Sequence, residues 1–173
     1  MSKEHDTAVY PGTFDPLTLG HQDLILRSSK VFRNVIVAVA ATSSKAGTMF
    51  SLEERMDMVR EAVAAEGITG VTVEPLDGLL VDWCDRRGVG LVVRGLRAYS
   101  DFEYEFQMAL TNRQLNPKIE TLFLMPNEEH SYITASMVRE VARFGGRVCD
   151  FVPPTVARRV AEWRKAKMEG VKK

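Results

Sequence analysis

The sequence predicts an α/β fold, built as a doubly wound parallel sheet of five strands that is followed by C-terminal helices. Short runs rich in β-branched residues alternate along the chain with longer amphipathic stretches, and the links between them are short. This alternation is typical of a parallel sheet that is covered by helices on both faces. The crossovers should be right-handed, and the order 3-2-1-4-5 of a Rossmann-like sheet fits the pattern.

The first half of the chain contains three expected strands and two expected helices. The run TAVY at residues 7–10 begins the sheet, and NVIVAVAA from Asn34 is apolar over the length of a strand buried on both faces. One helical pattern starts at His21. A second starts at Ser51, where Ser51 and Glu54 have the spacing of a capping box. The third strand is expected at residues 70–75.

The second half continues the alternation and ends in helices. A short helix is expected from Gly78, the fourth strand (LVVRG) at residues 91–95, and a longer helix from Ser100. The fifth strand is expected at residues 120–126. Two helical segments follow, over residues 135–144 and from Pro154 to residue 167.

The composition fits one globular domain over residues 1–173 and argues against several classes of protein. Apolar residues make up 45% of the chain, and 23 basic residues balance 23 acidic ones, so a general nucleic-acid coat is not expected. No apolar run approaches the roughly 18 residues of a membrane span, and the N-terminus lacks an apolar signal core. Cys84 and Cys149 are expected to be reduced, buried thiols of a cytoplasmic protein.

The stretch YPGTFDPLTLGH, residues 10–21, is a candidate phosphate-binding turn after the first strand. Gly12 lets a ligand approach the backbone closely, and Thr13 adds a hydroxyl and an N–H beside it. Gly20 and His21 open a helix, whose N-terminus favours anions. The alternative is a Gly/Pro turn with an incidental histidine. The stretch matches neither the P-loop nor the GxGxxG fingerprint.

Three further stretches follow expected strands at the same edge of the sheet. They cover residues 41–50, 92–105 and 128–140, and their candidate phosphate ligands are Lys45, Arg94, Arg97, Ser131, Thr134 and Ser136. Taken singly, each has a plainer interpretation, because a lysine in a loop is usually only exposed to solvent and Ser or Thr hydroxyls often cap helices. The carboxylates of Asp101 and Glu103, in the same stretch as Arg94, suit the solvated start of a helix. Together they predict a polyphosphate ligand, because open α/β sheets bind ligands where the strand order reverses.

Several motifs occur in an order that resembles one known family. The segments are YPGTFDPLTLGHQD, MFSLEER, RGLRAYSDFEYEFQMA, LFLMP and SYITASMVREVA, and they extend over most of the chain. They resemble the bacterial phosphopantetheine adenylyltransferase family, in which residues 13–21 correspond to the T/HxGH motif of nucleotidyltransferases. The DFEYEFQMA block is much more specific to this family than TLGH is.

The resemblance implies a reaction and a setting. Members transfer AMP from ATP to 4′-phosphopantetheine, which gives dephospho-coenzyme A and pyrophosphate in the penultimate step of coenzyme A synthesis. They use magnesium with ATP. The histidines of this chain have no metal-ligand spacing, so no metal-site residues are named, and the sequence leaves open whether magnesium has a protein ligand. The resemblance further implies a cytoplasmic homohexamer that coenzyme A inhibits in some members.

The resemblance also implies roles for single residues. Thr13 would orient the attacking 4′-phosphate, and His21 would contact the α-phosphate of ATP. Lys45 and Arg94 would hold the phosphate of the pantetheine substrate, and Leu80 would line its pantetheine arm. The other implied ATP contacts are Phe14, Gly95, Leu96, Arg97, Glu105, His130, Ser131, Tyr132, Ile133, Thr134, Ala135 and Ser136.

Two departures and two alternatives belong to this interpretation. His130 stands where the family commonly has Trp or Tyr, and Ala135 lacks the hydroxyl usual at its position.

A phosphate monoester has a second pKa of about 6, so its attack needs positioning and relief of charge repulsion rather than a general base. The alternatives are transfer to another acceptor, such as nicotinate mononucleotide or glycerol phosphate, and a module that binds ATP or coenzyme A without chemistry.

Overall fold

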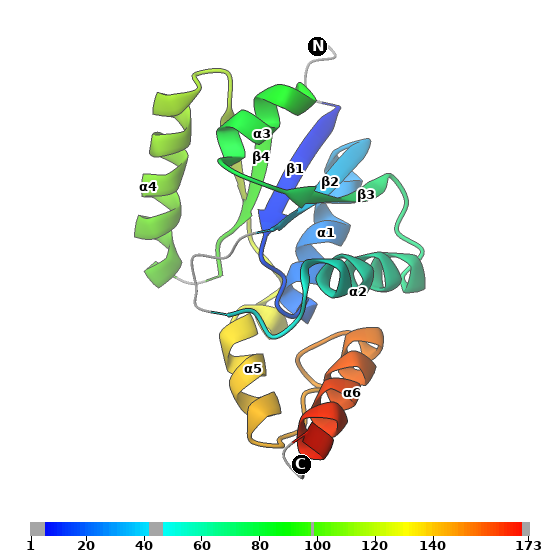
Figure 1. Cartoon of the computed structure of the whole chain (residues 1–173). Helices are drawn as coiled ribbons and strands as arrows, with labels where there is room; N and C mark the ends of the chain where they lie inside the picture. Colours follow the sequence, from blue (N-terminus) through cyan, green and yellow to red (C-terminus); the bar gives the residue numbers. More distant parts are fainter. Residues whose placement is uncertain (1–5, 42–46, 98, 171–173) are drawn as a thin grey trace.

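The computed structural model describes residues 6–41, 47–97 and 99–170, and the predicted fold class is confirmed (Figure 1). The elements in chain order are β1 (Thr7–Gly12), α1 (Leu19–Val31), β2 (Asn34–Ala40), α2 (Leu52–Ala65), β3 (Val71–Leu76), α3 (Leu80–Arg87), β4 (Leu91–Gly95), α4 (Tyr99–Leu115), β5 (Glu120–Leu124), η2 (Glu128–His130), α5 (Ala135–Arg143) and α6 (Pro154–Gly170). The strands lie in the order β3-β2-β1-β4-β5, and all neighbouring pairs are parallel.

The central strands are buried on both faces because alternate side chains enter two different apolar clusters. Tyr10 of β1 and Val37 of β2 belong to the larger cluster, which includes side chains of α1, α2, α5 and α6. Val9 and Ala38, one residue away on the same strands, belong to the smaller cluster with Trp83 of α3. Successive side chains of a strand point to opposite faces, so a strand covered on both sides needs a continuous apolar run.

Helices α1 and α2 both begin with capping boxes, and the start of α1 differs from the one expected from the sequence. Ser51 and Glu54 form the predicted box at α2, with the Ser51 N–H donating to Glu54 Oε2 at 2.8 Å. Helix α1 begins at Leu19 rather than at His21, with Thr18 as its N-cap. The pattern concealed this cap because a histidine, rather than Glu or Gln, accepts the bond from the capping N–H.

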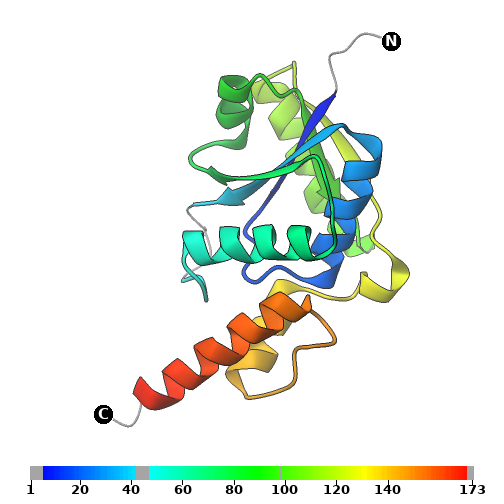
Figure 2. The same cartoon turned by 90° about the vertical axis from the view of Figure 1, so that its right-hand side faces the viewer.

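Helices α5 and α6 lie beyond the carboxyl ends of the strands, as the two views show (Figures 1 and 2). Val156 and Val160 of α6 belong to the larger core. Helix α6 is also joined to α2 by ion pairs from Arg158 and Arg159 to Glu61. The C-terminal helices therefore pack beside the edge of the sheet at which the sequence predicts ligand binding.

The two cysteines differ in their surroundings. Cys84 of α3 is buried, and burial raises the pKa of its thiol to about 11. Cys149 is exposed, so the expectation that it is buried is wrong. It lies in the turn between α5 and α6, where no apolar layer covers it. In the described parts of the chain, no helix has both the length and the apolar character needed to cross a membrane.

Candidate functional site

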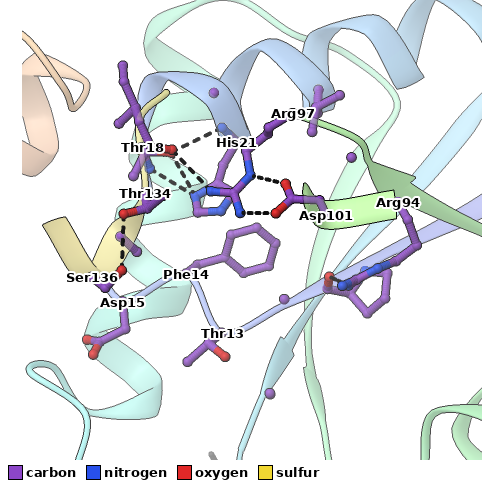
Figure 3. A pocket seen from close by; sticks show the side chains of 18 of the residues that line it. Thr13, Phe14, Asp15, Thr18, His21, Arg94, Arg97, Asp101, Thr134 and Ser136 are labelled. Atoms are coloured by element: carbon purple, nitrogen blue, oxygen red, sulfur yellow. Dashed lines mark hydrogen bonds and ion pairs between the residues drawn. The ribbon is translucent and has the colours of Figure 1, made fainter. Parts of the chain in front are cut away.

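A cavity of about 630 Å³ opens at the carboxyl ends of β1 and β4, where the strand order reverses (Figure 3). The predicted site residues that line it are Thr13, Phe14, His21, Arg94, Gly95, Arg97, Glu105, Ile133, Thr134, Ala135 and Ser136. The structure thus brings together residues of all four predicted stretches, since Gly47 and Thr48 of the stretch around Lys45 also line the cavity. Lys45 itself lies outside the described residues.

The loop after β1 forms one wall of the pocket around Phe14. Phe14 has a φ of 49°, a backbone conformation that is uncommon for a residue other than glycine. Its buried ring meets the rings of Tyr10 and His21 edge-on, with centroid distances of 5.4 and 5.2 Å. A Cβ at Gly12 would lie 2.7 Å from this ring, so Gly12 is the residue that gives the ring its space.

His21 is fixed by the N-cap of its own helix. Its Nδ1 accepts a hydrogen bond from the Thr18 N–H at 3.1 Å and lies 3.1 Å from Thr18 Oγ1, as the dashed lines of Figure 3 indicate. A backbone N–H can only donate, so Nδ1 carries no proton and the neutral ring carries its proton on Nε2. The Nε2–H group is therefore the donor that His21 can offer to a ligand.

The electrostatic surroundings keep this imidazole neutral. Burial, and after it the charges of Arg97 and Arg94, lowers the pKa of His21 from 6.5 to about 4. At pH 7 His21 is therefore a neutral hydrogen-bond donor rather than a cation. Such a donor stabilises negative charge that develops on a nearby oxygen.

Arg94, at the end of β4, is held from two sides. Its Nε and Nη2 donate to the two carboxylate oxygens of Glu105 on α4, at 2.8 and 2.6 Å, and its Nη1 donates to the Pro11 carbonyl at 3.0 Å. Burial lowers the pKa of Arg94, but the hydrogen bond and the charge of Glu105 outweigh this, and the pKa is raised. A guanidinium has five N–H groups, so two are left for a ligand.

Arg97 forms a second pair with α4. Its Nε donates to Asp101 Oδ2 at 3.0 Å (Figure 3). Its Nη1 donates to the Ile133 carbonyl at 3.4 Å. The interpretation of Asp101 as a solvated helix start is therefore incomplete, because Asp101 orients a pocket arginine. Glu103 is exposed, as a solvated helix start would be.

The start of α5 supplies hydroxyls and a helix N-terminus. Thr134 is the N-cap, as expected, and its Oγ1 accepts a hydrogen bond from the Met137 N–H at 3.1 Å. The Thr134 and Ser136 hydroxyls lie 3.0 Å apart. The N–H groups of a first helical turn and these hydroxyls together favour an anion.

Two charged residues of the pocket were not identified from the sequence. Arg139 of α5 donates to the backbone carbonyl of Asp15 and lies 3.7 Å from its carboxylate. The buried Asp15 carboxylate accepts from the N–H groups of Met49 and Phe50, at 2.8 and 3.0 Å. A signal for Arg139 existed, since it follows Ser136 by three residues and so shares its face of the helix.

Five predicted site residues do not line this cavity, namely Leu80, Leu96, His130, Ser131 and Tyr132. Leu80 packs against the smaller core cluster. The Leu96 N–H extends the β4–β5 pairing by donating to the Leu124 carbonyl at 3.0 Å. The Ser131 hydroxyl donates to the Glu128 carbonyl at 2.8 Å. The His130 carbonyl lies 3.2 Å from the position of a Cβ at Gly20, so this segment packs against the start of α1.

Comparison with known sequences gives consistent relatives. Residues 9–141 match the model of the cytidylyltransferase-like family. The phosphopantetheine adenylyltransferase of Thiobacillus denitrificans is 54% identical over 156 residues, which are 90% of this chain and 96% of that protein. The enzyme of the same name from Alkalilimnicola ehrlichii is 55% identical over 155 residues, which are 89% of this chain and 88% of that protein.

Solved structures share the fold at much lower identity. A bifunctional NMN adenylyltransferase/ADP ribose pyrophosphatase from Francisella tularensis has a TM-score of 0.73 and 17% identity, over 93% of this chain and 50% of that one. The Plasmodium falciparum nicotinic acid mononucleotide adenylyltransferase, complexed with NaAD, has a TM-score of 0.70 and 12% identity, over 91% and 95%. At these identities the likeness supports the fold alone.

Proposed function

The chain belongs to the phosphopantetheine adenylyltransferase family, and we propose that its pocket carries out that family's reaction through the residues described above. It transfers the adenylyl group of ATP to 4′-phosphopantetheine and releases dephospho-coenzyme A and pyrophosphate. The observation that carries the proposal is the convergence of a neutral histidine, three arginines and a helix N-terminus on one cavity at the switch point of the sheet. We also propose that residues 1–173 act as one cytoplasmic nucleotidyltransferase domain.

The reaction brings two negatively charged groups together, the phosphate of phosphopantetheine and the α-phosphate of ATP. The attacking phosphate of phosphopantetheine is largely dianionic at pH 7, so no side chain has to remove a proton from it. What the protein supplies is alignment and relief of repulsion between this phosphate and the α-phosphate of ATP. The positive charges of Arg94, Arg97 and Arg139 and the helix N-terminus at Thr134 serve that purpose.

Each lining residue then has a role in the proposal. Thr13 orients the attacking phosphate, and His21 donates its Nε2–H to the α-phosphate, where negative charge grows as a fifth oxygen approaches. Arg94 holds the phosphate of phosphopantetheine with the N–H groups that Glu105 and Pro11 do not use. Lys45 is proposed as a second ligand of this phosphate, and Leu80 as a contact of the pantetheine arm.

The nucleotide occupies the other side of the pocket. Its proposed contacts are Phe14, Gly95, Leu96, Arg97, Glu105, His130, Ser131, Tyr132, Ile133, Thr134, Ala135 and Ser136. The hydroxyls and N–H groups at the start of α5 bind the β- and γ-phosphates. Leu96 and the 130–132 segment do not line the cavity in this structure, so their proposed contacts are supported by the family resemblance alone.

Magnesium enters this proposal as part of the substrate. Among the residues that the structure describes, no group of three or more His, Cys, Asp or Glu side chains is arranged to hold a metal ion. The three carboxylates of the pocket are engaged, with Asp15 bound to backbone N–H groups and Asp101 and Glu105 bound to arginines. We therefore propose that magnesium arrives on the phosphates of ATP, with no dedicated protein ligands.

The surface of α4 supports assembly into a homohexamer. Its exposed apolar side chains are Phe102, Tyr104, Phe106, Met108, Leu110 and Leu115. At about 100° per residue, Phe102, Phe106 and Leu110 share one face, and the other three lie on the opposite face. Two unpartnered faces fit two kinds of contact with copies of the chain, as closed assemblies larger than a dimer need. Native mass spectrometry of wild type and Phe106→Glu tests this assembly.

Steady-state assays of pyrophosphate release test the reaction. We offer ATP with phosphopantetheine, nicotinate mononucleotide or glycerol phosphate. Turnover with another acceptor alone would replace the proposed substrate, and ATP binding without turnover would favour a non-catalytic module. Added coenzyme A shows whether it competes with either substrate.

Two variants separate the proposed roles. His21→Ala should lower kcat far more than it weakens ATP binding, since its donor acts where charge develops, and equal losses in both would make it a binding residue only. Arg94→Ala should mainly raise the KM for phosphopantetheine, and an unchanged KM would contradict its assignment.

A further inference from the structure

Arg55 of α2 is a buried arginine behind the pocket, and its hydrogen bonds go to backbone carbonyls. Its side chain is fully buried, with 1% of the residue exposed. Nη1 donates to the Thr13 carbonyl at 2.7 Å and to the Ala40 carbonyl at 2.9 Å. Nε donates to the carbonyls of Phe50 and Ser51, at 3.2 and 3.3 Å. Burying a charge is costly, and these bonds offset part of that cost by giving Nε and Nη1 their acceptors.

The four carbonyls belong to the segments that build the pocket edge. Thr13 follows β1 directly, Ala40 is the last residue of β2, and Phe50 and Ser51 lead into α2. One guanidinium thus fastens the carboxyl ends of two neighbouring strands to the start of a helix. Arg55 does not itself line the cavity, so it acts on a ligand through the residues it holds and, at longer range, through its charge, which Arg55→Lys would keep.

The bond to Thr13 fixes the direction of a backbone donor in the pocket. The Thr13–Phe14 peptide is trans, since Asp15–Pro16 is the cis bond of the described residues. In a trans peptide the C=O and the N–H point in opposite directions. With the Thr13 carbonyl turned toward Arg55, the Phe14 N–H faces away from it, and no described residue accepts a hydrogen bond from this N–H. Thr13 and Phe14 both line the cavity.

Phe14 itself needs such support. Its φ of 49° is a conformation that surrounding structure has to maintain in a residue with a side chain. The aromatic contacts hold its ring, whereas Arg55 holds the peptide plane that precedes it. The plane and the ring are therefore fixed by separate interactions, and the plane can be perturbed alone.

We propose that Arg55 is a positioning residue for adenylyl transfer, which fixes the Thr13–Phe14 peptide so that the Phe14 N–H donates to a phosphate oxygen of the reacting substrates. This proposal rests on the proposed function. A donor that is aligned before the reaction stabilises developing charge without reorganisation, and removal of one such donor costs about 10² to 10³ in kcat. Arg55 supplies that alignment without touching the substrate.

The test compares two substitutions of Arg55 with a control at an ion pair that joins α2 to α6. Arg55→Met keeps the apolar length but loses all four hydrogen bonds, and Arg55→Lys keeps the charge but lacks the fork that reaches Thr13 and Ala40 together. Arg159→Met is the control, because it removes the ion pair with Glu61 on α2 away from the cavity. For each we measure kcat, the KM of both substrates and the melting temperature.

The expected result is a loss of turnover without a matching loss of binding. Arg55→Lys should lower kcat at least about tenfold and Arg55→Met about a hundredfold, with the KM of ATP changed less than about threefold. Arg159→Met should keep kcat within about twofold, whatever it does to the melting temperature. If Arg55→Met does not fold, Arg55→Lys alone decides the outcome.

Each contrary result has a separate meaning. A folded Arg55→Lys enzyme with wild-type kcat overturns the positioning role. So does a fall in kcat that Arg159→Met reproduces at equal loss of stability, because general destabilisation then explains it. Wild-type protein that releases no pyrophosphate from ATP and phosphopantetheine would instead refute the proposed function.

Discussion

The neutral state of His21 makes the stability of the fold depend on pH over a defined window. In the folded protein the pKa of His21 is about 4, against 6.5 for an unperturbed histidine. Between these values the unfolded chain binds a proton that the folded chain does not, so stability falls as pH falls. Above pH 6.5 both states are neutral at this position and the effect is absent.

The size of the effect follows from the two pKa values. Each unit of pKa difference corresponds to about 1.4 kcal/mol, so the full loss on reaching pH 4 is about 3 kcal/mol. At pH 5, where more of the protein stays folded, the same linkage gives about 2 kcal/mol. For a chain of this length that corresponds to a fall of about 4 to 8 °C in melting temperature.

The assay compares wild type with His21→Gln from pH 7.5 to 4.5 by urea unfolding. Glutamine suits the N3 position of a capping box, so the variant keeps a partner for the Thr18 N–H and loses only the titrating group. Between pH 7 and pH 5, the unfolding free energy of wild type should fall by about 2 kcal/mol more than that of His21→Gln. His130→Gln, at a histidine outside the cavity, is the matched control. Parallel pH profiles for wild type and His21→Gln would refute the reasoning.

Three further predictions concern the frame of the pocket. Glu105→Gln leaves the charge of Arg94 uncompensated, so the melting temperature should fall, and inorganic phosphate should raise it more than in wild type; equal phosphate shifts in calorimetry would argue against this pairing. Gly12→Ala should cost about 1 to 3 kcal/mol in urea unfolding because its Cβ would press on the Phe14 ring, and a neutral result would mean that the ring yields. Thr134→Ala should cost about 1 kcal/mol through the lost cap of α5, whereas Thr134→Ser should restore it.

The order of the strands could be predicted because it depends on local pattern and on general rules of topology. Strand β4 was placed at its observed bounds, since an apolar run ends there in Arg94 and Gly95. The start of α1 was missed because His21 acts as the second half of a capping box, a role that composition does not reveal. Boundaries that depend on a single unusual side chain are therefore the weakest part of such a prediction.

The pocket was predictable as an edge of the sheet but not as a network. Arg94 and Glu105 are 11 positions apart and Arg139 and Asp15 are 124 apart, and nothing local links them. The role of Arg55 was equally hidden, because all its partners are backbone carbonyls that any residue would present. The types of side chain predicted which groups could bind phosphate. Which of these side chains are oriented by a hydrogen bond or an ion pair to another residue is determined by the fold.

Helix α4 carries both the carboxylates that hold the pocket arginines and the exposed apolar faces proposed to contact other copies of the chain. Asp101 and Glu105 alternate along it with Phe102 and Phe106, whose rings stack at 5.6 Å. A neighbouring subunit that shifts this helix also shifts the counterions of Arg94 and Arg97. By thermodynamic reciprocity, a phosphate that draws on those arginines changes how firmly the subunits associate. The affinity for substrate should then depend on protein concentration, to the same extent that substrate changes the association of the subunits.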